Sequence, residues 1–217
     1  MGDLIRLADR RTRGQSDATE GIRAEFFFDL ASPFTYLAAE RVDRAFDAVT
    51  WTPACARTLR CRELPAGEAD AGEIFARAEQ RAGVLRLPLE WPERWPAPVP
   101  AAMRVAHHAA QAGRGAGFVL AATRLAFAGG FDLEDVEILT EAAAAAGLPL
   151  EDCLRAARED RRDGAIEAAA RRLLGAGADR LPALATDTRV LWGEERVGDA
   201  AVTARLRAGT LTPYDLG

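Results

Sequence analysis

The chain has 217 residues, a formal net charge of −5 at pH 7 and a hydrophobic fraction of 49%, a composition typical of a soluble globular protein with one or two domains. It contains no lysine and no asparagine, which excludes lysine Schiff-base chemistry, a P-loop and N-glycosylation. The acidic balance argues against nucleic-acid binding, no apolar run approaches the roughly 20 residues of a membrane helix, and two histidines cannot provide three histidine metal ligands.

The first third of the chain predicts a strand, a helix and a second strand. Residues 1–21 are polar and lack the apolar stretch of a signal peptide, so we expect a mobile extension there. The aromatic run IRAEFFFDL predicts a buried strand, and the helix predicted next begins at Ser32 and Pro33. The segment AVTWTPACAR predicts the second strand. This order indicates the beginning of a parallel α/β sheet.

The middle of the chain, residues 68–159, predicts helices and no strand. The expected helices span about 69–82, 100–112, 117–128, 133–146 and 150–158. The proline-rich stretch LPLEWPERWPAPVP contains Trp91 and Trp95. We expect it to be an ordered loop, because indole rings seldom stay exposed.

The last third returns to mixed structure. IEAAARRLLGAGA predicts a helix, and residues 183–186 and 189–192 predict a hairpin. Gly193 then turns the chain, a helix is expected to begin at Glu194, Glu195 and Arg196, and the chain is expected to end in the helix around 200–207. The Leu181–Pro182 bond enters a strand and is a candidate cis bond. The sum is a thioredoxin-like α/β fold with an all-helical insertion. Its expected domains are a thioredoxin-like unit of residues 22–67 and 160–217 and an insertion of residues 68–159.

The segment DLASPFTYL carries the sharpest chemical signal. Ser32 stands where a strand passes into a helix, close to unpaired backbone N–H groups and the positive end of the helix dipole. One interpretation is that Ser32 only caps the helix, as Ser-Pro pairs commonly do. The other is that its hydroxyl stabilises an anion such as a phosphate, a carboxylate or a thiolate. A serine hydrolase is disfavoured, because Ser32 is not in a G-x-S-x-G elbow.

Three segments together carry a family resemblance. EFFFDLASPFTYLAAERV resembles the opening of 2-hydroxychromene-2-carboxylate isomerases and kappa-class glutathione transferases, which belong to the DsbA-like thioredoxin superfamily. AAMRVA is similar to the A-M-R segment of the kappa-class transferases. LPALATDTRVLWGEERV resembles the cis-proline strand, hairpin and turn of the same proteins. The resemblance covers about residues 23–209.

The resemblance implies a glutathione-dependent isomerase of a small aromatic or conjugated carboxylic acid, acting by thiolate addition, bond rotation and elimination, or alternatively a kappa-like glutathione transferase. Ser32 would hold the glutathione sulfur as thiolate, by the means that lower thiol pKa values in disulfide oxidoreductases. The implied glutathione-binding residues are Pro33, Phe34, Leu181, Pro182, Glu194 and Glu195. Arg94 and Arg104 are the candidate partners for a substrate carboxylate. These roles require an open groove beside Ser32 and Pro182.

The chain also departs from the family pattern. The asparagine that the family usually places after the second strand is absent, and the approach to Pro182 reads GAGADRLP. Another small thiol could therefore replace glutathione, or the site could be degenerate. The alternative functions are a DsbA-like thiol-disulfide oxidoreductase and a non-catalytic binding protein.

The remaining expectations concern cysteines, cofactors and partners. Cys55, Cys61 and Cys153 form no C-x-x-C pair, so we expect reduced thiols in a cytoplasmic protein. We expect a small-molecule substrate, no metal, no nucleic acid and no membrane. Members of the family are commonly homodimers.

Overall fold

A computed structural model of the chain describes residues 23–59, 68–187 and 189–207. The predicted extension at residues 1–21 and Cys61 lie outside the described residues. The sheet has the strand order β2-β1-β3-β4. Strand β1 (Arg23–Phe28) pairs in parallel with β2 (Ala48–Pro53) and antiparallel with β3 (Ala183–Ala185). Strand β4 (Val190–Trp192) is antiparallel to β3, which confirms the predicted hairpin.

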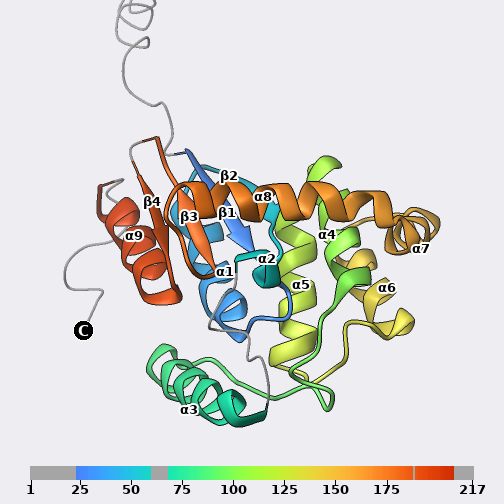
Figure 1. The fold of residues 1–217 in the computed structure, drawn as a ribbon, viewed down its shortest axis with the longest axis horizontal. Coiled ribbons are helices and arrows are strands. Elements are labelled where there is room, and N and C mark those ends of the chain that lie inside the picture. The colour runs from blue at the N-terminus through green and yellow to red at the C-terminus, as the bar shows by residue number, and fades with distance from the viewer. Residues whose placement is uncertain (1–22, 60–67, 188, 208–217) are drawn as a thin grey trace, which may run out of the picture.

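Helices cover both faces of the sheet (Figure 1). Successive side chains of a strand point to opposite faces, so Phe26 and Phe28 pack in one cluster and Phe27 in another. The first cluster contains residues of α1 (Pro33–Ala45) and α9 (Glu194–Arg207). The second contains residues of α2 and α8. The sheet is therefore the middle layer of three.

The chain between α2 and α8 is helical in the part that the structure describes, residues 68–159. The helices are α2 (Ala56–Leu59), α3 (Glu68–Leu85), α4 (Pro100–Gln111), α5 (Gly115–Phe127), α6 (Val136–Ala145), α7 (Leu150–Arg158), the short 3-10 helix η2 (Asp160–Arg162) and α8 (Asp163–Gly175). Figure 1 shows α4 to α7 beside the sheet and α3 set apart below it. The thioredoxin-like fold with a helical insertion is thus confirmed.

The structure corrects one helix start and adds one short helix. Helix α6 begins at Val136 and not near residue 133, because the Asp135 carboxylate accepts a hydrogen bond from the Glu137 N–H and caps the helix there. The last helix begins at Glu194, as predicted, and is one continuous helix to Arg207. The one-turn helix α2 has too few residues to show an apolar period, so no local pattern predicts it.

The proline-rich loop is ordered, as predicted. Phe75 of α3 packs against the rings of Trp91 and Trp95, with ring centroids 4.0 and 4.8 Å away. The Tyr36 hydroxyl of α1 donates to the Pro88 carbonyl at 2.9 Å. These contacts hold the loop against the N-terminal half of α1. Among the described residues, no helix is both long and apolar enough to span a membrane.

Candidate functional site

The turn between β1 and α1 is held by the side chain of its own first residue. The Asp29 carboxylate accepts from the Ala31 N–H at 2.9 Å through one oxygen and from the Ala56 N–H at 3.0 Å through the other. The Asp29 carbonyl accepts from the Ser32 N–H at 3.1 Å. Burial raises the pKa of the Asp29 carboxyl above its usual range, and these backbone hydrogen bonds oppose the increase. Asp29 therefore joins the end of β1, the turn and α2.

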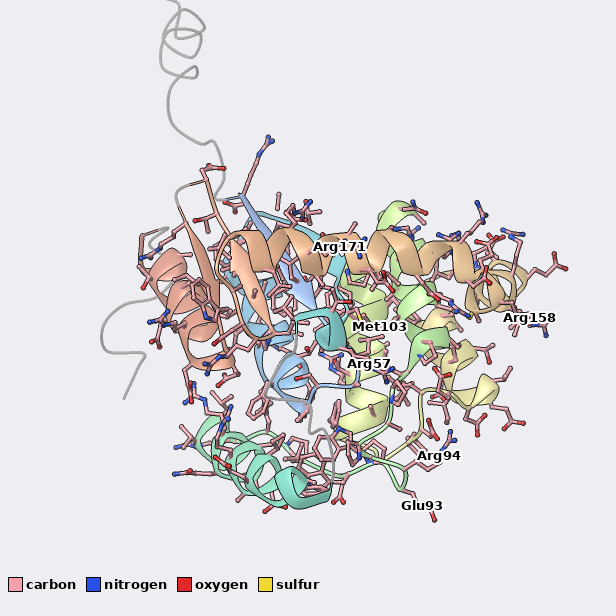
Figure 2. The ribbon with its side chains drawn as sticks, in the orientation of Figure 1. Arg57, Glu93, Arg94, Met103, Arg158 and Arg171 are labelled. Carbon is pink, nitrogen blue, oxygen red and sulfur yellow. The ribbon has the colours of Figure 1, made fainter. Side chains whose placement is uncertain are left out.

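Two residues of the insertion hold the same turn from outside. The Trp95 indole N–H donates to the Ala31 carbonyl at 2.9 Å. The Leu30 N–H donates to the Met103 sulfur of α4 at 3.3 Å. Figure 2 shows Met103 in the interior, beside α2 in this view. The backbone that presents Ser32 is thus fixed by contacts from three separate parts of the chain.

Ser32 is at the N-cap position of α1, but its side chain does not cap the helix. Its backbone is extended, Pro33 follows at the first helical position, and the side chain makes no capping hydrogen bond. The Ser32 carbonyl, not the hydroxyl, receives the Thr35 N–H, at 3.1 Å. The residue is 1% exposed, and its Oγ has no hydrogen-bond partner. The simple capping interpretation is therefore wrong, and the hydroxyl is a buried polar group without a partner.

The Ser32 oxygen does not face an open groove, contrary to what its expected role requires. A hollow does lie next to the turn, and its walls include Leu30, Ala31 and Trp95 but neither Ser32 nor Pro182. Its volume is about 20 Å³, enough for about one water molecule. A ligand sulfur can reach the Ser32 hydroxyl only if neighbouring groups move.

Thr35, one helical turn after Ser32, has the same property. It is completely buried, and its Oγ1 has no hydrogen-bond partner. Pro33 and Phe34 between them are also buried, and the guanidinium of Arg77 from α3 lies 4.6 Å from the centre of the Phe34 ring. The first turn of α1 therefore contains two hydroxyl groups that the protein itself does not satisfy.

The Leu181–Pro182 segment lies at the same end of the sheet as Ser32. Its peptide bond is cis, as the sequence indicated. Because Phe27 pairs with Ala183 in an antiparallel register, Pro182 stands next to the end of β1. Leu181 is buried, and the Pro182 carbonyl accepts from the Gly193 N–H at 2.9 Å. Gly193 has φ +88°, so it allows the turn into α9 that most side chains would resist.

Glu194 is not available to a ligand in the way the resemblance implied. Its carboxylate is 2% exposed and forms ion pairs with Arg41 of α1 and Arg81 of α3, the latter at 2.6 Å. Burial and the nearby Arg81 lower the pKa of Arg41 to about 10. The carboxylate that the resemblance assigned to glutathione is thus already paired with two guanidinium groups. Glu195 is exposed on the first turn of α9.

The structure separates the two arginines predicted to bind a substrate carboxylate. Arg94 lines the hollow beside Leu30 and Ala31, where it pairs with Asp132. Figure 2 shows it on the loop at the lower edge of the molecule.

Arg104 lies elsewhere and is already engaged. Its guanidinium donates to both oxygens of Asp163 at the start of α8, at 2.7 and 2.6 Å, and to the Ala157 carbonyl at 3.3 Å. These bonds raise the pKa of Arg104 and lower that of Asp163. Arg104 therefore connects α4 to α7 and α8, and the structure does not support its assignment to the substrate.

The two cysteines that the structure describes form no dithiol at the start of α1. Cys55 and Cys153 are free, and burial raises the pKa of the Cys153 thiol. The part of the chain that the structure describes contains no group of three or more His, Cys, Asp or Glu side chains placed to hold a metal ion.

Sequence reasoning missed the residues that support the turn. The acid that ends the strand IRAEFFFDL indicates a strand boundary, but nothing in the pattern shows that it fixes the backbone before Ser32. Trp95 and Met103 are 64 and 73 residues away from their partners in the chain, so no local pattern could reveal those contacts. The same is true of Arg41 and Arg81, which meet Glu194 from distant helices.

A family model described as a DSBA-like thioredoxin domain matches residues 23–201. No curated protein matches the chain in sequence.

Several solved structures share the fold at low identity. A 2-hydroxychromene-2-carboxylate isomerase aligns with a TM-score of 0.70 at 12% identity, covering 88% of this chain and 100% of its own. A probable DsbA oxidoreductase from Streptomyces coelicolor aligns with a TM-score of 0.64 at 22% identity, covering 88% and 92%. The cytosolic disulfide reductase DsbM from Pseudomonas aeruginosa, in a structure with GSH, aligns with a TM-score of 0.63 at 16% identity, covering 87% of this chain and 98% of its own. At these identities the likenesses show the fold.

Proposed function

Given that the chain belongs to the DSBA-like thioredoxin domain family, we propose that it uses a low-molecular-weight thiol, glutathione or another small thiol, to isomerise a small aromatic or conjugated carboxylic acid. Ser32 holds the thiol sulfur. When bound, the thiol supplies a nucleophile that adds reversibly to a conjugated carbon and so permits rotation about a double bond. The isomerase and the GSH-bound reductase among the structural neighbours agree with this chemistry.

The unpartnered hydroxyl of Ser32 is the observation that carries the proposal. A buried hydroxyl without a hydrogen bond costs about 1–3 kcal/mol, and native proteins rarely tolerate one without a reason. Here the cost falls at a helix N-terminus, where the dipole favours an anion. A thiolate accepts the hydrogen bond that the protein leaves unmade.

Disulfide exchange is the less suitable reaction for this helix start. It requires a nucleophilic thiolate, and the residues on the first turn are Ser32 and Thr35. Neither hydroxyl can form a mixed disulfide. A thiol-dependent reaction at this turn therefore needs its sulfur from the bound molecule.

The acid substrate would bind at the hollow beside the turn once that region has opened. It is walled by apolar groups, including the rings of Trp95, Phe127 and Phe131, with Arg94 at its edge. Phe131 is 47% exposed, so part of this wall is open to solvent. Arg94 would release Asp132 to bind the substrate carboxylate. Because the hollow holds about one water and Ser32 is covered, binding has to open this region. We place the reaction in a reducing compartment, the cytoplasm.

A second candidate function is a binding protein without catalysis. The burial of the Ser32 oxygen favours it, because a sealed site cannot turn over a substrate. The two candidates differ in their response to added thiol.

The test is an isomerisation assay with 2-hydroxychromene-2-carboxylate, followed by its ultraviolet spectrum with and without glutathione. We expect a spectral change that needs both protein and thiol and that disappears in Ser32→Ala. Thr123→Val, a change in a buried hydroxyl of α5, is the matched control and should retain the activity. Thiol binding without any turnover, of this acid or of related conjugated acids, would favour the binding protein.

A further inference from the structure

We infer that Thr35 is a second hydrogen-bond donor to the ligand sulfur, so that the thiolate is held by two hydroxyl groups and not by Ser32 alone. This inference rests on the proposed function, because it concerns the same ligand atom. It is carried by an observation of its own, the buried and unpartnered Oγ1 of Thr35.

The two side chains occupy positions that meet at a helix start. Ser32 is the N-cap, and Thr35 is the third helical residue after Pro33 and Phe34. These are the positions whose side chains and backbone approach each other in a capping box. The two hydroxyls are not hydrogen-bonded to each other, since neither has a partner. In the inferred complex the ligand sulfur accepts from both.

The carbonyls that usually accept from a helical threonine do not accept from the Thr35 hydroxyl. A threonine within a helix commonly donates to the carbonyl three or four residues earlier. For Thr35 these are the carbonyls of Ser32, which receives the Thr35 N–H, and of Ala31, which receives the Trp95 indole N–H. Each of these carbonyls has a donor, and neither donor is the Thr35 hydroxyl.

Thr123 shows what a buried threonine commonly does inside a helix. It is 1% exposed in α5, and its hydroxyl donates to the Val119 carbonyl, four residues earlier, at 2.8 Å. The two threonines have the same side chain and nearly the same burial in helices of the same length. Only the one beside Ser32 is left without a partner, which points to an external acceptor.

Two hydroxyl donors favour the ionised form of the sulfur. Neutral sulfur is a weak acceptor, whereas a hydrogen bond to a charged group is stronger. The first turn of α1 contains no acid that would repel a thiolate. The carboxylate nearest in sequence, Asp29, is engaged by two backbone N–H groups. On binding, the S–H bond breaks, the proton leaves to solvent, and both hydroxyls donate to the remaining electron pairs.

The test compares Thr35→Val, Thr35→Ser and Thr123→Val in the full-length protein. Glutathione is the probe, its affinity is measured by calorimetry, and the pKa of its bound thiol is followed through the ultraviolet absorbance of the thiolate. Loss of one charge-assisted hydrogen bond should raise that pKa by about one and weaken binding at neutral pH about tenfold. Thr35→Ser should keep most of the wild-type values, and Thr123→Val should keep them all.

The outcomes separate this inference from the proposed function. If the wild type and Thr35→Val bind the thiol equally and with the same thiol pKa, while Ser32→Ala loses both, Thr35 is not a donor and the proposed function survives. If the wild type binds neither glutathione nor cysteine, both are overturned. If Thr35→Val keeps the wild-type affinity and thiol pKa while Thr35→Ser loses them, the methyl group matters and the hydroxyl does not, and the inference is overturned.

Discussion

The starts of α1 and α9 both bury polar side chains, and they treat them in opposite ways. At α9 the Glu194 carboxylate is buried and receives two guanidinium groups, from Arg41 and Arg81. At α1 the hydroxyls of Ser32 and Thr35 are buried and have no hydrogen-bond partner among the described residues. A buried group that is fully paired has a structural explanation. A buried group left unpaired beside a helix dipole calls for a ligand.

The resemblance implied that Glu194 binds glutathione, whereas its ion pairs give it a structural role. The ion pairs join α1, α3 and α9, three elements far apart in the chain. The start of α9 therefore fixes the framework. The start of α1 is where we propose that the thiol binds. The following predictions test that division, beginning with the largest effect.

Removal of the Glu194 charge should give the largest loss of stability. In Glu194→Gln, the two guanidinium groups of Arg41 and Arg81 lose their buried counter-ion, which we expect to cost about 3 kcal/mol. Urea denaturation measures it, and Glu195→Gln is the exposed control with a change near zero. Equal stability of the two variants would show that Glu194 is not structural.

Asp29→Asn should lower the free energy of unfolding by about 1–3 kcal/mol, because an amide has one acceptor oxygen and cannot accept well from both the Ala31 and the Ala56 N–H groups. The pH dependence gives a second readout. Burial raises the folded-state pKa of Asp29 above 3.8, so its contribution to stability is full below that pH and declines as pH rises through the folded pKa. Urea denaturation over this pH range should show that decline in the wild type and not in the variant. A decline of equal size in both would contradict the assignment.

Ser32→Ala should leave stability unchanged or raise it by up to about 1 kcal/mol, because the hydroxyl makes no bond in the folded protein. Asp135→Ala, which removes a cap that is in use, should cost about 1 kcal/mol. Thermal unfolding of the two variants compares the loss of a hydroxyl that makes no capping hydrogen bond with the loss of a carboxylate that makes one. Equal destabilisation would restore Ser32 to the role of an ordinary N-cap.

Arg104→Gln should have the smallest effect. It removes the pairing with Asp163, a partly exposed group, and we expect a loss below about 1 kcal/mol in the free energy of unfolding. Arg104 lowers the pKa of Asp163, so this stability is present above pH 3.8 and is lost as pH falls through the folded pKa. Thiol binding and isomerisation should be unaffected. A rise in KM for the acid would return Arg104 to the substrate site.

The sequence predicted the fold well, because most of its elements carry a local signal. The aromatic run before Ser32, the stripe of α1 and the hairpin around residue 187 all depend on neighbours within a few residues. The site was harder. The position of Ser32 between a strand and a helix identified it as a candidate site residue. The burial of its hydroxyl and the lack of a hydrogen-bond partner depend on tertiary packing, which a local pattern does not encode. Glu194 was misassigned for the same reason, since its partners come from helices 113 and more residues away.

The most direct test of the central claim is the pKa of the glutathione thiol bound to the wild type and to Ser32→Ala, measured through thiolate absorbance across a pH titration. The account predicts that the wild type lowers this pKa well below that of free glutathione and that the variant, equally stable, loses most of the effect. An unchanged thiol pKa in the wild type, or the same lowered value in both proteins, would contradict it.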